Sequence, residues 1–71
     1  MNELQLDIVG FDLHGMRHTA RDVRYTIDGG KAKVTKYGSI RPSSGAPFDA
    51  TGSDFIRGKI GNAINAHRKH G

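Results

Sequence analysis

The sequence contains no cysteine and no tryptophan, and only two of its 71 residues are proline. Without cysteine the chain can form neither a disulfide nor a thiolate metal site, and a small secreted domain usually needs such a staple. We therefore expect a cytoplasmic protein. No apolar run approaches the roughly 20 residues of a membrane span. The N-terminal segment MNELQLDIVG also lacks the basic and apolar regions of a signal peptide.

The length and the charge of the chain favour a small binding protein. Seventy-one residues predict one small domain over residues 1–71. The net charge is +4, and residues 21–71 carry ten basic against four acidic side chains, whereas residues 1–20 carry one against three. This asymmetry is compatible with a nucleic acid or an acidic protein surface as partner, and equally with lysines that are only solvated.

The most informative segment is VRYTIDGGKAKVTKY, residues 23–37. Apolar and polar residues alternate on both sides of Asp28-Gly29-Gly30, whose residues tolerate the positive φ angles of a tight hairpin turn. The pattern predicts a β-hairpin with one apolar and one basic face. Two registers remain open: a Gly29-Gly30 loop sets Asp28 opposite Lys31, and an Asp28-Gly29 loop sets Arg24 opposite Lys33.

Residues 3–8 alternate cleanly and predict a half-buried strand with Leu4, Leu6 and Ile8 in the core. The next apolar residues, Val9 and Phe11, fall on the other side of this alternation, which predicts a β-bulge at Gly10. Residues 11–20 show no clear period and are expected to form a loop. The sequence does not determine whether that loop is ordered.

The C-terminal part predicts a loop followed by a helix. Residues 38–52 are rich in Gly, Pro and Ser, with Phe48 expected to anchor the loop in the core. The helix begins after an N-cap at Thr51 or Ser53 and turns one apolar stripe toward the sheet. The expected fold is α+β, a three- or four-stranded antiparallel sheet with the C-terminal helix packed on one face. The predicted core is Leu4, Leu6, Ile8, Val23, Tyr25, Ile27, Val34, Phe55 or Ile56, Ile60 and Ile64.

Within the helical region a short glycine motif resembles the nucleic-acid-binding loop of KH domains, whose glycines let the backbone approach a strand. Its residues are Gly58, Lys59, Ile60 and Gly61. A KH domain needs a further strand after the helix that follows this loop, and the sequence offers none. The competing interpretation, which we favour, is a locally packed or kinked helix.

Four histidines could in principle hold a metal ion. His14 and His18 are four residues apart, and His67 and His70 are three apart, spacings that place two imidazoles on one helical face. Nothing in the sequence brings the pairs together, so we expect no metal site and no cofactor. No serine lies in a nucleophile elbow, and the chain is not expected to be an enzyme.

The basic side of the hairpin is the best candidate site. Arg24 and two hairpin lysines point away from the predicted core, a third lysine lies at the strand end, and two arginines flank the sheet. The predicted partner-binding residues are Arg21, Arg24, Lys31, Lys33, Lys36 and Arg41. A sheet backed by one helix can lay such a face into a DNA major groove. Exposed strand lysines can also simply discourage edge-to-edge aggregation.

The order of these signals resembles one kind of small phage-encoded anti-CRISPR protein directed at type I systems. The similarity covers roughly residues 25–69. Its elements are the strand with Tyr25, the Asp28-Gly29 turn, the strand Lys31-Ala32-Lys33, the segment FDAT at 48–51 and the terminal GKIGNAINAHRK. The resemblance implies a stoichiometric inhibitor that docks on the RNA-bearing surveillance complex in the host cytoplasm and keeps target DNA from pairing with the guide.

Two hypotheses therefore stand. The first is a non-catalytic inhibitor that binds a host protein or nucleoprotein complex. The alternative is a module that binds DNA or RNA directly, through the basic hairpin face or the glycine motif. Monomer and homodimer are both compatible with the sequence, because a three-stranded sheet leaves open edges that a second copy could pair with.

Overall fold

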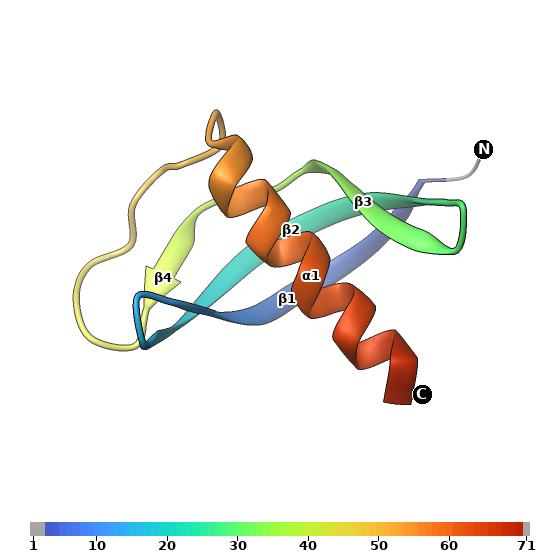
Figure 1. Ribbon diagram of the computed structural model, residues 1–71. Helices are drawn as coiled ribbons and strands as arrows, with labels where there is room; N and C mark the ends of the chain where they lie inside the picture. The colour runs from blue at the N-terminus through green and yellow to red at the C-terminus, as the bar shows by residue number, and fades with distance from the viewer. Residues whose placement is uncertain (1–2, 71) are drawn as a thin grey trace.

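The structure is a computed structural model that describes residues 3–70, and the side chains of residues 3–68. Its elements are β1 (Leu4–Leu13), β2 (Met16–Asp28), β3 (Lys31–Lys36), β4 (Ile40–Pro42) and α1 (Asp54–His70). β2 lies at the centre, paired with β1 along one side and with both β3 and β4 along the other. All pairings are antiparallel, and α1 lies across one face of the sheet (Figure 1). The expected α+β fold is confirmed, with four strands.

The hairpin between β2 and β3 has the first of the two predicted registers. Asp28 lies opposite Lys31 and Thr26 opposite Lys33, so Gly29 and Gly30 form the two-residue loop. Both glycines have positive φ, 62° and 80°, as a type I′ turn requires. The alternative Asp28-Gly29 loop is wrong.

A second hairpin occupies the region expected to be a loop. β1 runs to Leu13 and β2 begins at Met16, with Leu13 opposite Met16. The connection is His14-Gly15, again with two positive φ angles, 52° and 76°. The expectation of a loop over residues 11–20 is therefore wrong. The overlooked signal is Gly15 preceded by histidine, a residue enriched among the few non-glycines that adopt positive φ.

The buried side of β1 also differs from the prediction. Val9, Phe11 and Leu13 belong to the core, whereas the predicted core residues Leu4, Leu6 and Ile8 are 43%, 37% and 53% exposed. The β1–β2 register is continuous from Ile8 to Leu13, so no bulge occurs at Gly10. Leu4 and Leu6 are paired with Tyr25 and Val23 on the side of the core but remain exposed there. Ile8 is paired with Arg21, so only the second apolar set of β1 is buried.

Two irregularities in the sheet change which residues point toward α1. Asp22 has a φ of 53°, and the buried residues of β2 change from His18 and Ala20 before it to Val23 after it. In β3 the pairing passes from Tyr25–Val34 to Arg24–Lys36, which leaves Thr35 as the extra residue of a bulge. These shifts bring side chains to the core that simple alternation would place outside.

The helix begins at one of the two predicted N-cap residues. The Ser53 side-chain oxygen accepts a hydrogen bond from the backbone N–H of Ile56, 3.2 Å away, so Ser53 and not Thr51 is the N-cap. Ile56, Ile60 and Ile64 form the predicted apolar stripe and are all buried. Phe55, the other candidate for the first position of that stripe, is 59% exposed.

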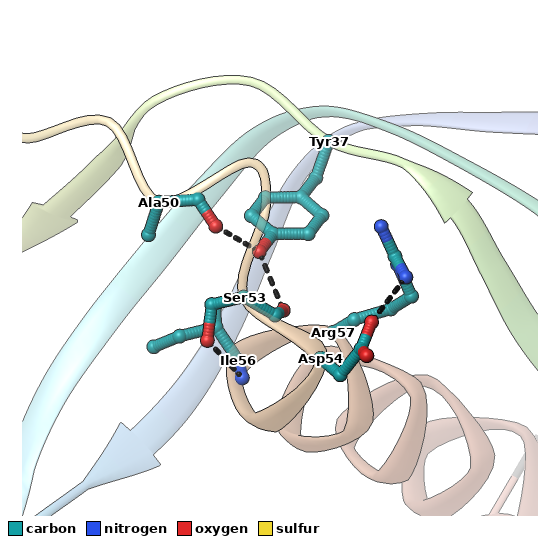
Figure 2. A network of polar contacts seen from close by, with 6 residues as sticks. All are labelled: Tyr37, Ala50, Ser53, Asp54, Ile56 and Arg57. Carbon is teal, nitrogen blue, oxygen red and sulfur yellow. Dashed lines mark hydrogen bonds and ion pairs between the residues drawn. The ribbon is translucent and has the colours of Figure 1, made fainter.

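Tyr37 joins the sheet to the start of α1 (Figure 2). Its ring is buried, and its hydroxyl donates to the Ala50 carbonyl and lies 2.9 Å from the Ser53 carbonyl. Burial raises the pKa of Tyr37 above its ordinary value. Sequence alternation did not identify this anchor, because the Thr35 bulge is what turns Tyr37 inward.

The long connection before α1 returns along β4. Backbone hydrogen bonds of 2.9 Å join Ile40 and Phe48 in both directions. The Phe48 ring, expected to be an anchor in the core, is instead 41% exposed and meets the His18 ring edge-on. No helix in the described part of the chain has the length and apolarity needed to cross a membrane.

Candidate partner-binding surface

The side of the sheet turned away from α1 carries most of the predicted binding residues. Arg24 lies between Val23 and Tyr25, which turn toward the core. Lys31 and Lys33 flank Ala32, which is buried under the helix. Because successive side chains of a strand point to opposite faces, these cations lie on the helix-free face.

The bulge at Thr35 adds a third lysine to this face. Lys36 is exposed and lies directly opposite Arg24, and directly paired residues share a face of the sheet. Simple alternation from Val34 would have given Lys36 core parity. The Thr35 hydroxyl donates to the Arg24 carbonyl over 3.1 Å and so ties the bulge to β2.

The other end of the same face carries the two flanking arginines. Arg21 follows the buried Ala20 on β2, and Arg41 lies next to the buried Ile40 on β4. Arg41 is paired with Thr19, two residues from Arg21. The structure thus brings all six predicted residues to one side of the sheet, which we call the basic face: Arg21, Arg24, Lys31, Lys33, Lys36 and Arg41.

Two cations of the basic face have a carboxylate partner. Lys33 Nζ lies 3.1 Å from Asp28 Oδ2, and Arg24 Nη1 lies 3.7 Å from Glu3 Oε1. These side chains are roughly half exposed or more, so each pair contributes only about 0–1 kcal/mol. Within the described residues, four cations of the basic face form no ion pair: Arg21, Lys31, Lys36 and Arg41.

One further arginine belongs beside the basic face and was missed from the sequence. Arg17 of β2 lies opposite Asp12, and its guanidinium is 3.5 Å from the Asp12 carboxylate. The side chain extends over Gly10 of β1, where a Cβ would lie 2.6 Å from Arg17 Nη2. A glycine inside a strand often marks such a close approach. That signal was visible in the sequence, although its partner was not.

The glycine motif has no loop geometry. Gly58, Lys59, Ile60 and Gly61 all lie inside α1, and the Ile60 side chain is fully buried. Gly61 faces the sheet, where a Cβ would lie 3.6 Å from the Ala32 carbonyl oxygen. The similarity to a KH loop is therefore overturned, because these residues pack a helix against β3.

The histidines lie in different surroundings. The His14 ring stacks on Phe55 with centroids 6.4 Å apart, whereas His18 is buried and stacks on Phe11. His67 is exposed on α1, and the side chain of His70 lies outside the described residues. Among the described residues, no three His, Asp or Glu side chains are grouped so that they could hold a metal ion.

A hollow lies on the helix side, between β1 and the C-terminal half of α1. It has a volume of about 670 Å³ and is lined by apolar residues such as Leu6, Phe11 and Ala63, with Lys59 and His67 beside them. No serine, threonine or cysteine is among the described residues that line it. The basic face is therefore the stronger candidate site.

Comparison with known proteins gives this surface no precedent. No protein family, curated protein or solved structure matches the chain.

Proposed function

We propose that the chain is a non-catalytic binding protein whose basic face docks on a negatively charged partner. The observation that carries this proposal is the gathering of six basic side chains from β2, β3 and β4 on the sheet face that α1 leaves uncovered. A face of one sign raises the local concentration of an oppositely charged partner and speeds its association.

The fuller proposal is a phage-type inhibitor of a host nucleoprotein complex, most specifically a type I CRISPR surveillance complex. It is supported by the sequence resemblance over roughly residues 25–69 and by a basic surface suited to the region where such a complex holds nucleic acid. The inhibitor acts stoichiometrically in the host cytoplasm, as a monomer or homodimer, by occupying the surface that target DNA needs.

A purified type I surveillance complex tests this proposal directly. The chain is added in increasing ratio, and two quantities are followed: comigration with the complex in size-exclusion chromatography, and binding of labelled target DNA by fluorescence anisotropy. We expect comigration together with loss of DNA binding near one equivalent per site. A chain that fails to comigrate and leaves DNA binding intact contradicts the inhibitor proposal.

Direct binding of DNA or RNA is the second candidate. It is favoured by the arginines exposed on the open sheet face, because arginine is suited to phosphate and base edges alike. A pull-down from bacterial lysate with and without nuclease separates the two candidates. A protein complex retained after nuclease supports the inhibitor, whereas nucleic acid alone, lost on nuclease treatment, supports the direct module.

A further inference from the structure

We infer that three arginines form a contact site for the phosphate backbone of nucleic acid. Arg21 and Arg41 belong to the basic face and Arg17 lies beside it; we call the three the arginine end. The inference rests on the proposed function and deepens it, because it names the chemistry of the partner and the residues that meet it. The phosphates are those of a free DNA duplex or strand, which is the ligand that the experiment below uses.

The three arginines have a spacing that suits a charged strand. Arg17 and Arg21 are four residues apart on β2, with Thr19 between them facing the same way, and Arg41 is paired with Thr19 on β4. Four residues of a strand span about 13 Å, and neighbouring strands lie about 4.8 Å apart. That span equals the axial length of about four phosphates of one nucleic-acid strand.

The backbone under these arginines is held on both sides. Arg17 and Arg21 are paired with Asp12 and Ile8 of β1. On the opposite side the Ser43 N–H donates to the Arg17 carbonyl over 2.8 Å, and the Gly38 N–H donates to the Arg21 carbonyl over 2.7 Å. A contact site built on a rigid central strand loses less conformational entropy on binding than one on a mobile loop.

Arg17 is also oriented before any partner arrives. Gly10 leaves the space in which the guanidinium extends across β1, and the Asp12 carboxylate holds it at 3.5 Å. Arg21 and Arg41 form no ion pair within the described residues, so their guanidinium groups keep their donors for a partner. A guanidinium can bind phosphate oxygens with two parallel hydrogen bonds, which an ammonium group cannot do.

The opposite end of the basic face provides an internal comparison. It carries Lys31, Lys33 and Lys36, here called the lysine end, on β3. Lys33 is 3.1 Å from Asp28, and lysine side chains are flexible point charges. Removing three positive charges from either end changes the net charge equally, so any difference in binding reports position and chemistry rather than total charge.

The experiment compares two triple variants of the full chain, Arg17→Gln/Arg21→Gln/Arg41→Gln and Lys31→Gln/Lys33→Gln/Lys36→Gln. Fluorescence anisotropy measures binding to a labelled mixed-sequence DNA duplex and to its separate strands between about 50 and 200 mM salt. Affinity falls as the salt concentration rises, and each lost phosphate contact makes the slope of log affinity against log salt shallower by about 1. We expect the slope to become shallower by about 3 for the arginine triple variant and by less than half of that for the lysine triple variant.

Two further measurements test whether binding depends on the phosphate charge of the DNA and on the orientation of the Arg17 side chain. A duplex with neutral methylphosphonate linkages should bind wild type no better than the unmodified duplex binds the arginine triple. The substitution Gly10→Ala keeps every charge but would place a Cβ 2.6 Å from Arg17 Nη2, so it should shift the guanidinium and lower affinity by less than Arg17→Gln does. Circular dichroism melting checks that each variant is folded, and the single variant Arg17→Gln replaces Gly10→Ala if the latter is not.

The outcomes separate this inference from the proposed function. Equal losses for the two triples, or a larger loss for the lysine triple, overturn the inference and leave the proposed function standing. The same holds if wild type binds the surveillance complex but neither form of DNA. If wild type binds neither complex nor nucleic acid, both are wrong. If only the arginine triple variant loses affinity, for the free duplex and for the complex alike, the result supports both the inference and the proposed function.

Discussion

The side-chain oxygen of Asn65 on α1 accepts a hydrogen bond from the backbone N–H of Ala32, with 2.7 Å between the two atoms. Ala32 belongs to β3, whose outer edge is paired with no strand among residues 3–70. A backbone donor at such an edge would otherwise be left for another chain to pair with. The helix therefore both covers the sheet and satisfies one backbone donor of this edge.

Replacing Asn65 with alanine should lower the free energy of unfolding by about 1–3 kcal/mol, because the partly buried Ala32 N–H loses its acceptor. The matched control is Asn62→Ala, which removes the same side chain from an exposed position of the same helix. Urea denaturation followed by circular dichroism measures both. Equal stabilities for the two variants would show that the hydrogen bond adds nothing to the fold.

Tyr37→Phe removes the hydroxyl that joins the sheet to the residues before α1, leaving the Ala50 and Ser53 carbonyls without this donor. We expect a loss of about 1–3 kcal/mol at neutral pH. The ring itself stays in place, so the far-ultraviolet circular dichroism spectrum should not change. Thermal or urea unfolding gives the difference.

The same tyrosine makes stability depend on alkaline pH. Burial raises the pKa of Tyr37, so the folded state holds the phenolic proton more tightly than the unfolded state, whose value is about 10. The resulting stabilisation is complete below that value and is lost as the pH rises through the raised pKa of the folded state. The stability gap between wild type and Tyr37→Phe should accordingly narrow above about pH 10. A constant gap would contradict this account.

Two isoleucines of opposite burial test the core. Ile60→Ala should cost about 2–5 kcal/mol, because Ile60 is fully buried between α1 and the sheet. Ile8→Ala removes the same atoms from a side chain that is 53% exposed, and should cost less than about 1 kcal/mol. If Ile8 proves the more costly site, the buried side of β1 has been assigned wrongly.

The difficulty with β1 shows what periodicity leaves undetermined. Two apolar sets of opposite parity follow one another in LQLDIVGFDL, and each alone predicts a half-buried strand. The choice between them is made by where α1 crosses the sheet, which is a long-range contact. The apolar stripe of α1 could be predicted because it repeats over three turns with no competing set.

The basic face was predictable to a similar extent. Alternation alone places Arg24, Lys31 and Lys33 on the outer side of the hairpin. Lys36 required the Thr35 bulge, and Arg17 required the space over Gly10, which depends on a residue of another strand. Backbone irregularities and contacts between strands are not encoded in a two-residue period. Lys36 was therefore predicted only from its place at a strand end, and Arg17 was found only in the structure.

The glycine motif offers a gain in stability. Gly58 lies inside α1 with an exposed, open position, where a Cβ would meet no atom within 4 Å. Gly58→Ala should raise the free energy of unfolding by about 0.5–1 kcal/mol, because alanine loses less backbone entropy in a helix. Gly30→Ala is the contrasting variant, since its φ of 80° is strained for alanine, and we expect it to lower the melting temperature.

Charge reversal separates the binding surface from the fold. In Lys31→Glu/Lys33→Glu both side chains are exposed, and among the ion pairs of the described residues only the surface contact between Lys33 and Asp28 is lost, worth about 0–1 kcal/mol. We expect the free energy of unfolding to change by less than about 2 kcal/mol while affinity for the negatively charged partner falls.

The matched control for this reversal is Lys59→Glu/Arg68→Glu, which changes the net charge equally but on α1. Its Arg68 substitution also removes a 3.3 Å hydrogen bond from Arg68 Nη1 to the Gly30 carbonyl oxygen. Surface plasmon resonance against the immobilised surveillance complex or a DNA duplex gives the association rate of each variant. Only the hairpin double variant should associate much more slowly, because steering depends on where the positive charge lies. Equal slowing of the two would mean that total charge, and not the basic face, governs binding.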